Sequence, residues 1–271
     1  MSATARSHAG ASAADAESIS RLNLLSCNIL AGGSVRRYRD YVTQSWEQVL
    51  PTSTKRSNLD RFARLLADFD LVGLQEADAG SLRSGFVNQT QYLAEAAGFP
   101  YWSHQPNRKL ARFVASSNGL LTRLAPAEVL DYPLPGRIPG RGALWVRFGD
   151  GERALIVIIA HLSLGPLARK RQLGFLAELI AARPHVVLMG DLNCTAHSSE
   201  LRPLFRHTSL RPPHDAAPAT FPSWRPRRAI DHILVSADLA VERLWTLPHA
   251  VSDHLPLAAR VRLPMALARH A

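Results

Sequence analysis

The chain has 271 residues, of which 46% are hydrophobic and 20% are charged, and this balance excludes a mainly disordered protein. Its 32 Lys and Arg residues outnumber the 22 Asp and Glu residues and give a formal net charge of +10. A positive field of this size predicts an anionic partner, although an arginine-rich genomic composition explains the same charge without one.

We expect a single domain over residues 21–264, flanked by a disordered tail at 1–20 and a short tail at 265–271. Residues 1–20 are rich in Ala and Ser and lack the continuous apolar run of about 7–15 residues that a secretory signal needs. No stretch reaches the roughly 20 apolar residues of a membrane span, so we expect a cytoplasmic protein and, by default, a monomer. The two cysteines, Cys27 and Cys194, are too few for a disulfide framework, and we expect both to be buried.

Apolar patterns in the first half of the chain predict strands that alternate with helices. The run Leu22–Leu30 suits a buried strand. In Arg56–Phe69, apolar residues recur at spacings of three and four, which predicts an amphipathic helix, and Asp70–Glu76 follows as a second buried strand. Gln89–Ala97 is expected to be helical, and Asn118–Thr122 is expected to be a strand.

The middle of the chain predicts a hairpin followed by a helix and a strand. Asp150 and Gly151 form a turn signal between the apolar runs Gly142–Phe148 and Arg153–Ala160, the second of which leads into His161. The helix is expected at 170–182 and the strand at 186–189.

The remainder is expected to hold an irregular surface region and two more strands. Arg202–Arg228 is rich in Pro, Arg and His, which predicts little regular structure. The last two strands are expected at Ala229–Val235 and Pro256–Val261. Helices that alternate with strands in this way indicate a layered α/β or α+β domain.

Polar residues that bind metals or move protons stand at the ends of several predicted strands. They are Asn28, Glu76, His161, Asp191, Asn193, Asp231, Asp253 and His254. A carboxylate directly after an apolar strand is costly to bury unless it meets a cation or a hydrogen-bond donor. Few, hard oxygen ligands suit Mg²⁺ or Mn²⁺ rather than zinc. Each residue taken singly also has a structural explanation, such as a turn cap, so their joint occurrence is what indicates a site.

The order of these segments resembles that of the endonuclease/exonuclease/phosphatase superfamily over about residues 22 to 262. Its two most specific motifs here are Gly190-Asp191-Leu192-Asn193 and Ser252-Asp253-His254-Leu255-Pro256. The other segments that carry the resemblance are Ser26–Asn28, Leu74–Glu76, Asn118–Arg123, Ala160–Leu162 and Ile230–Ile233. The resemblance implies a four-layer αββα sandwich with two central mixed β-sheets, and a divalent-metal-dependent hydrolase of phosphate esters.

The resemblance also implies which residues hold the metal. Glu76 would be the main ligand of Mg²⁺ or Mn²⁺, and Asn28 and Asp253 would assist it. In-line attack on a phosphate ester places extra charge on the nonbridging oxygens, which a divalent ion neutralises.

By the same resemblance, the remaining site residues carry the catalytic roles. Asp191 would orient or deprotonate the attacking water, and Asn193 would hold the scissile phosphate. His254, oriented by Asp231, would bind a phosphate oxygen, and His161 would take the second histidine position of the deoxyribonuclease-like and sphingomyelinase-like branches. A carboxylate beside an imidazole raises its pKa and fixes its tautomer, so the imidazolium of His254 would face the phosphate near neutral pH.

Substrate contacts are expected from Asn118, Arg141, Trp224 and Arg225, because arginine grips phosphate and a tryptophan ring stacks on a base or enters a membrane interface. Nucleic acid is the favoured substrate. The alternatives are a phospholipid headgroup, with peripheral contact to an anionic membrane, and a small phosphoester. No tyrosine occupies the phosphate-contacting place of the abasic-site nucleases, which disfavours a dedicated DNA-repair role. A non-catalytic binding protein is disfavoured because the principal catalytic positions are all retained.

Overall fold

The computed structural model describes residues 21–29, 53–80, 86–110, 114–136, 140–211, 217–249, 251–264 and 267. The tail expected at 1–20 and, apart from Leu267, the tail expected at 265–271 lie outside these residues. In chain order the elements are β1 (Arg21–Asn28), α2 (Ser53–Leu66), β2 (Leu71–Asp78), α3 (Gln89–Ala97), β3 (Tyr101–Leu110), β4 (Val114–Thr122), β5 (Glu128–Pro133), β6 (Gly142–Phe148), the 3-10 turn η4 (Gly151–Arg153), β7 (Leu155–His161), α4 (Pro166–Ile180), β8 (Val186–Asp191), α5 (Arg202–His207), β9 (Asp231–Val235), β10 (Ala240–Thr246) and β11 (Leu257–Arg262).

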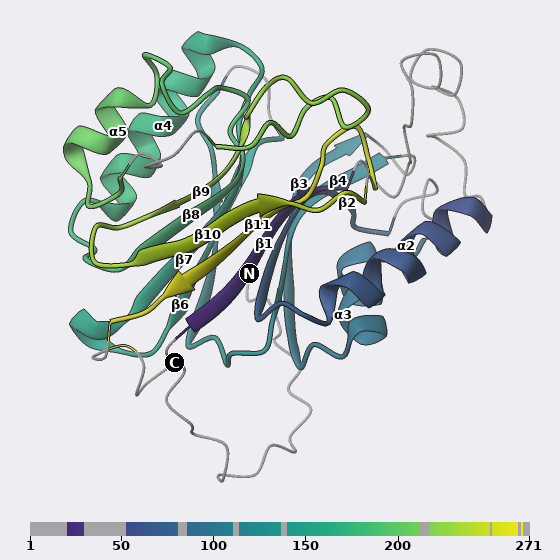
Figure 1. Cartoon of the computed structure of the whole chain (residues 1–271). Helices are drawn as coiled ribbons and strands as arrows, with labels where there is room; N and C mark the ends of the chain where they lie inside the picture. Colours follow the sequence, from purple (N-terminus) through teal and green to yellow (C-terminus); the bar gives the residue numbers. More distant parts are fainter. Residues whose placement is uncertain are drawn as a thin grey trace, which may run out of the picture.

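The strands form two mixed sheets, as the resemblance implies. The first sheet has the order β10-β11-β1-β2-β4-β3, and the second has the order β5-β6-β7-β8-β9. The pairs β1–β2 and β7–β8 are parallel, whereas the other neighbours are antiparallel. Figure 1 shows α2 and α3 on the outer side of the first sheet and α4 and α5 on the outer side of the second. The four-layer αββα sandwich predicted from the sequence is therefore confirmed.

Apolar side chains fill all three spaces between the layers. Between the sheets, Leu24 of β1 packs with Val157 and Met189 of the second sheet. The next residue of β1, Leu25, points to the other side and packs with Phe62 of α2. Strands buried on both faces read as continuous apolar runs, which is why the sequence revealed β1, β2, β7 and β8. A third cluster packs the outer side of the second sheet against α4 and α5.

Three strands that the sequence analysis missed are edge strands. β3 and β10 are the two edges of the first sheet, and β5 is one edge of the second. The expectation that 229–235 and 256–261 are the last two strands was wrong, because β10 lies between them. Most residues of β5 and β10 are exposed or half-buried, so neither strand shows an apolar run. The helix α5 likewise lies within the stretch 202–228 that was expected to be irregular.

Other details match the expectations. The helix α3 has the predicted bounds and ends at Gly98, whose φ of 69° suits glycine. Cys27 and Cys194 are both buried, and burial raises the pKa of each thiol. Among the described residues, no helix combines the length and the apolar character that crossing a membrane requires.

Candidate active site

Three of the predicted site residues lie side by side at the ends of β7, β8 and β9. His161 is paired directly with Asp191, and Asp191 is paired directly with Asp231. Neighbouring strands lie about 4.8 Å apart, so this register brings one imidazole and two carboxylates into a single row. All three side chains are buried.

Glu76 reaches this row from the first sheet because β2 contains a bulge. Leu74 packs on the side of α2 and α3, and strict alternation along a strand would point Glu76 to that same side. The pairing of β2 with β4 instead shifts between Leu74 and Ala77, and Glu76 has a φ of 56°. Its Oε1 then lies 3.8 Å from Nε2 of His161 in the second sheet. The bulge therefore turns the carboxylate towards the site.

Gly190 and Asn193 shape the chain around Asp191. Gly190 has a φ of 141°, and a Cβ at this position would lie 1.9 Å from the carbonyl oxygen of Ala160, so only glycine fits. Asn193 has a φ of 54°, a left-handed conformation that asparagine adopts more readily than most residues. Its backbone N–H donates to Oδ1 of Asp191, and its Nδ2 donates to the carbonyl of Leu162, both at 2.9 Å. The backbone of Asn193 thus fixes one oxygen of Asp191, and its side chain ties this turn to the residue that follows β7.

Asp191 lies at the centre of the site. Its Oδ2 accepts a hydrogen bond from Nδ2 of Asn28 at 3.3 Å, which joins the two sheets. The same oxygen lies 3.4 Å from Nε2 of His161 and 3.8 Å from Nε2 of His254. The site is therefore complete only when both sheets have packed together.

His254 is held by a network of side chains. Its Nδ1 lies 2.8 Å from Oδ2 of Asp231, and that oxygen also accepts a hydrogen bond from Oγ1 of Thr220. The hydroxyl of Ser252 accepts from the backbone N–H of His254 at 3.0 Å and donates to the carbonyl of Asn28. The imidazole thus presents its Nε2 to Asp191 in a fixed orientation.

The two histidines differ in charge at neutral pH. Burial lowers the pKa of His254, but the charge of Asp231 and the hydrogen bond to it outweigh burial and raise that pKa to about 9. Burial, and then the charges of Arg141 and His254, hold the pKa of His161 well below its usual range. His254 is therefore an imidazolium, whereas His161 is a neutral imidazole.

The carboxylates of the site repel one another. Burial and then the charge of Asp231 raise the pKa of Asp191 to about 7, and the charge of Glu76 adds to this rise. Burial also raises the pKa of Asp253, and Glu76 adds to that rise too. A divalent cation among these groups would offset the repulsion and favour the ionised carboxylates.

The donor chemistry fits such a cation. Glu76, Asp253 and Asn28 offer the oxygen donors that Mg²⁺ and Mn²⁺ prefer. Asp191, Asp231 and His254 form a second grouping, whose potential ligand atoms all lie within 4.8 Å of one another. Protonated imidazole has no lone pair for a metal, so the raised pKa of His254 makes this second grouping better suited to proton and phosphate chemistry.

Asn118, predicted to contact substrate, links the two sheets in the structure. It is fully buried in β4 of the first sheet. Its Nδ2 donates to Oε1 of Gln105 at 3.1 Å and to the carbonyl of Gly142, in the second sheet, at 2.8 Å. Its amide therefore ties the sheets together beside the site.

The other three predicted substrate contacts differ in their environment. Arg141 is half-buried, and its charge acts on His161, which places it beside the site. Trp224 is half-buried and Arg225 is exposed, in the segment that follows Thr220. Their roles in binding stay predictions.

Sequence reasoning missed Thr220 and Phe221, which lie in the stretch expected to be an irregular surface region. Thr220 is fully buried, and the ring centroid of Phe221 lies 4.9 Å from that of His254. The backbone N–H of Leu255 donates to the carbonyl of Thr220 at 2.9 Å, which fixes this segment against the site. The local sequence carries no periodic signal for this burial, because the packing partners lie far away along the chain.

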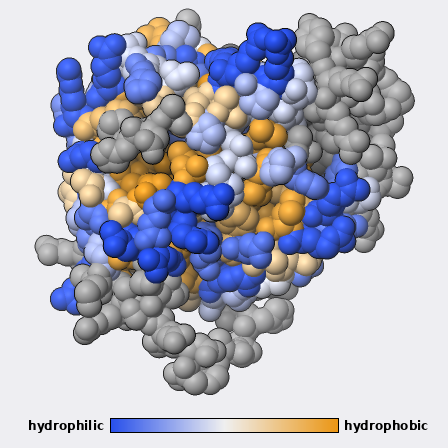
Figure 2. Space-filling model, viewed as in Figure 1, coloured by the Kyte–Doolittle hydropathy of each residue, from blue (hydrophilic) through white to orange (hydrophobic). Residues whose placement is uncertain are grey.

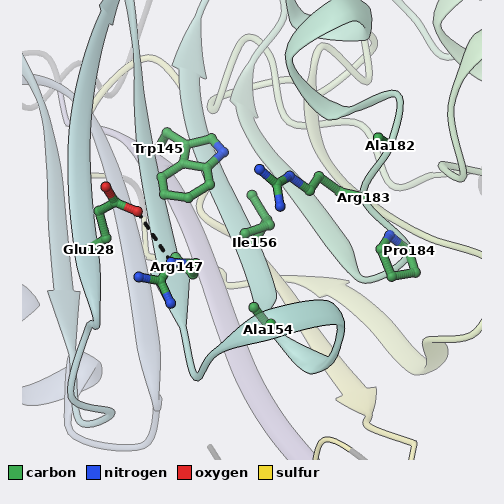
Figure 3. Close-up of a pocket in the computed structure, with 9 residues that line it drawn as sticks. Glu128, Trp145, Arg147, Ala154, Ile156, Ala182, Arg183 and Pro184 are labelled. Carbon is green, nitrogen blue, oxygen red and sulfur yellow. Dashed lines mark hydrogen bonds and ion pairs between the residues drawn. The ribbon is translucent and has the colours of Figure 1, made fainter.

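A surface pocket elsewhere in the second sheet is distinct from this site (Figure 3). Its lining includes Trp145, Ala154 and Pro184. Ala154 and Pro184 stand just before β7 and β8, whereas His161 and Asp191 stand at the far ends of those strands. The pocket therefore lies at the opposite end of β7 and β8 from His161 and Asp191.

Comparison with known proteins gives one family match and many structural matches. The family described as "Endonuclease/Exonuclease/phosphatase family" matches residues 25–254. No curated protein matches the chain. An endonuclease/exonuclease/phosphatase from Beutenbergia cavernae is 20% identical, with a TM-score of 0.67 over 90% of this chain and 72% of that one.

Two further solved structures share the fold. A mannosyl-6-phosphatase from Bacteroides thetaiotaomicron is 17% identical, with a TM-score of 0.63 over 89% of this chain and 99% of that one. D. rerio TDP2 in complex with a single strand DNA product is 14% identical, with a TM-score of 0.62 over 90% of this chain and 99% of that one. At these identities the likeness shows the fold alone.

Proposed function

Because the chain belongs to the endonuclease/exonuclease/phosphatase family, whose members hydrolyse phosphoesters, we propose that it is a metal-dependent phosphodiesterase that cleaves nucleic acid with an activated water. The observation that carries the proposal is the surroundings of Asp191. One buried carboxylate lies within 3.8 Å of a neutral and a charged histidine, and both sheets contribute to its contacts. This combination supports the proposal, because a carboxylate able to accept a proton beside a fixed positive charge suits the hydrolysis of a phosphate ester.

In the proposed mechanism, Asp191 accepts the proton of the attacking water as its oxygen bonds to phosphorus. The ester P–O bond on the opposite side breaks, and the leaving oxygen takes a proton from solvent. His161 fixes this carboxylate, since a neutral imidazole beside a carboxylate points an N–H at it. The imidazolium of His254 donates its Nε2–H to a nonbridging phosphate oxygen as negative charge builds there, and Asp231 balances the imidazolium. A divalent cation held by Glu76, Asn28 and Asp253 would neutralise further charge on the phosphate.

Asn193 and Arg141 are proposed to position the substrate. The amide of Asn193 uses one N–H on the carbonyl of Leu162, and its second N–H is assigned to the scissile phosphate. Arg141 lies close enough to His161 to lower the pKa of that residue, so its guanidinium is within electrostatic range of a phosphate in the site.

Two observations support nucleic acid as the substrate. The formal net charge of +10 favours a polyanion, and TDP2, which shares the fold, was solved with a single strand DNA product. The mannosyl-6-phosphatase of the same fold supports a small phosphoester as the alternative. Both substrates would use the same catalytic residues, so an assay must separate them.

The test is hydrolysis of a substrate panel with and without Mg²⁺ or Mn²⁺, at low and at high salt. The panel contains plasmid DNA, single-stranded DNA, RNA, sphingomyelin, an anionic phospholipid and a sugar phosphate. Metal-dependent cleavage of nucleic acid that weakens as salt rises supports the proposal, because binding to many phosphates is strongly salt-dependent. Activity confined to a lipid or to the sugar phosphate would reject the nuclease.

An Asp191→Asn variant guards this assay against contaminating nucleases. We expect its turnover to fall by roughly 10²–10⁴-fold, which is what a positioned general base contributes. Asp150→Asn is the matched control, since Asp150 is exposed and interacts with Arg147 away from the site. Equal activity in both variants would contradict the mechanism.

A further inference from the structure

Four arginines gather on the outer face of the first sheet, at its β10 edge. They are Arg21, Arg243, Arg260 and Arg262, and we call them the arginine strip. Arg21 is paired directly with Arg262, and Arg260 is paired directly with Arg243, so all four side chains point to one side of the sheet. Their neighbours Leu22, Ala259 and Val261 point to the other side, into the core between the sheets.

None of the helices that the structure describes covers this part of the sheet in the view of Figure 1, where α2 and α3 lie beside β1 and β2 and away from β10 and β11. Figure 2 shows strongly hydrophilic side chains gathered over β10 and β11 in the same view. The side chains of Arg21 and Arg262 are 57% and 60% exposed. The strip therefore faces solvent.

Two guanidinium groups of the strip are held in place by hydrogen bonds from Nε. Nε of Arg21 donates to Glu242 at 2.8 Å, and Nε of Arg260 donates to Oδ1 of Asn23 at 3.0 Å. Nε of Arg262 lies 3.9 Å from Glu242. Within the described residues, the terminal Nη atoms of these arginines make no hydrogen bond. Pre-oriented guanidiniums with unused Nη atoms are suited to bind phosphate oxygens in pairs.

Charge and the covered aromatic ring favour a nucleic-acid backbone over a membrane as the partner. The strip carries four positive charges, and Glu242 is the negative charge bound to it. The guanidinium of Arg243 lies 4.7 Å above the ring of Trp245, so the aromatic group of this surface is covered rather than presented as an apolar anchor. Stable membrane binding needs apolar insertion or a lipid chain in addition to charge, whereas a polyphosphate strand needs charge alone.

We propose that the arginine strip is a second binding surface for the phosphate backbone of nucleic acid, remote from the active site. Arg21 begins β1 and Asn28 ends it, so the strip lies about 20 Å from the site along the strand. A long strand reaches both places, whereas a dinucleotide reaches only the site. The choice of nucleic acid as the ligand rests on the proposed function.

The test compares binding of a single-stranded oligodeoxynucleotide of about 30 residues to the full chain, by fluorescence anisotropy in EDTA so that no cleavage occurs. The variant is Arg21→Gln, Arg260→Gln, Arg262→Gln together. The matched control removes the same charge from the α4 and α5 side, with Arg171→Gln, Arg183→Gln and Arg202→Gln, all of which are exposed.

We expect the strip variant to bind the oligonucleotide roughly a hundredfold more weakly at 0.1 M salt. The plot of log affinity against log salt should also become less steep, its negative slope shrinking in magnitude by about 2. The control variant should lose much less. Hydrolysis of bis(p-nitrophenyl) phosphate, which reaches only the site, should be equal in the wild type and the strip variant.

Equal loss of affinity in the two triple variants would overturn the proposal, because net charge alone would then explain the binding. Unchanged oligonucleotide affinity in the strip variant, alongside lost binding to vesicles of anionic phospholipid, would overturn it in favour of a membrane. If the wild type binds DNA through the strip but hydrolyses no diester, the proposed function fails while the binding surface stands.

Discussion

Nδ1 of His254 lies 2.8 Å from Oδ2 of Asp231, and this carboxylate keeps the pKa of the imidazole at about 9 although the ring is buried. An Asp231→Asn substitution removes the charge but retains the size of the side chain. Burial is then offset only by the charges of Asp191 and Asp253, so the pKa of His254 should fall clearly from about 9, and a larger share of the rings should be neutral at neutral pH. An NMR titration of the histidine ring protons in metal-free protein measures this pKa.

The control for this titration is Asp238→Asn, which removes a carboxylate that pairs with His185 outside the site. It should leave the pKa of His254 near 9. In the proposed mechanism the imidazolium of His254 is the active form, so the loss of activity on the alkaline side should move to lower pH in the Asp231→Asn variant. A His254 pKa that stays near 9 in that variant would show that another group holds the proton.

Thr220 should act as a positioning residue for the same pair. Its hydroxyl donates to the oxygen of Asp231 that also bonds to His254, and the side chain is fully buried. Thr220→Val keeps the shape and removes the donor, so we expect a loss of about 2 kcal/mol in the free energy of unfolding, typical of a hydrogen bond to a charged group. We also expect kcat to fall roughly tenfold, because the imidazole loses its fixed orientation.

Thr220→Ser is the control for Thr220→Val, because it retains the hydroxyl and loses only a methyl group. Steady-state kinetics should show most of the activity restored in the serine variant, with KM similar in all three proteins. If valine and serine give the same kcat, the hydroxyl does not position His254 and the effect comes from packing.

Glu76 is predicted to bind the metal, and its removal should be visible without any substrate. The Glu76 side chain is 27% exposed and lies among carboxylates whose repulsion a cation would offset. Mn²⁺ or Mg²⁺ should raise the melting temperature of the wild type, since a ligand that binds only the folded state stabilises it. In Glu76→Gln, titration calorimetry should show at least about tenfold weaker binding of the ion.

Glu95→Gln is the matched control, because Glu95 is exposed on α3 and bonds to Gln91. It should bind the ion as the wild type does. Unchanged metal affinity in Glu76→Gln would move the metal to the alternative grouping around Asp191, Asp231 and His254.

The parts of the fold that the sequence predicted are those where burial is two-sided or strictly periodic. β1 and β2 lie inside the first sheet, and their continuous apolar runs are visible without a structure. Edge strands such as β5 and β10 are mostly exposed or half-buried, so their sequence resembles a loop. Burial, rather than strand length, therefore decided which strands could be recognised, since the edge strand β9 is buried throughout and was predicted.

The site residues also divide into those that a local motif reveals and those that only long-range contacts reveal. Asp191 and His254 were predicted as site residues because each lies in a compact motif. Thr220 could not be predicted, because a hydrogen bond to Asp231, rather than a local motif, links it to the site. The bulge that turns Glu76 towards His161 was also invisible, because it arises from the pairing of β2 with β4. Long-range pairing is the information that local patterns lack.

Two glycine-to-alanine substitutions should change stability in opposite directions. Gly190 has a φ of 141°, and an added Cβ would lie 1.9 Å from the backbone oxygen of Ala160, which cannot move without breaking the pairing of β7 with β8. We expect Gly190→Ala to lower the free energy of unfolding by at least about 3 kcal/mol. Gly174 is exposed in the middle of α4, and a Cβ there meets no atom within 4 Å. Gly174→Ala should raise the free energy of unfolding by roughly 0.5–1 kcal/mol, because alanine loses less backbone entropy in a helix. Urea unfolding followed by circular dichroism measures both, and a Gly190→Ala variant as stable as the wild type would show that the turn before Asp191 is not built as described.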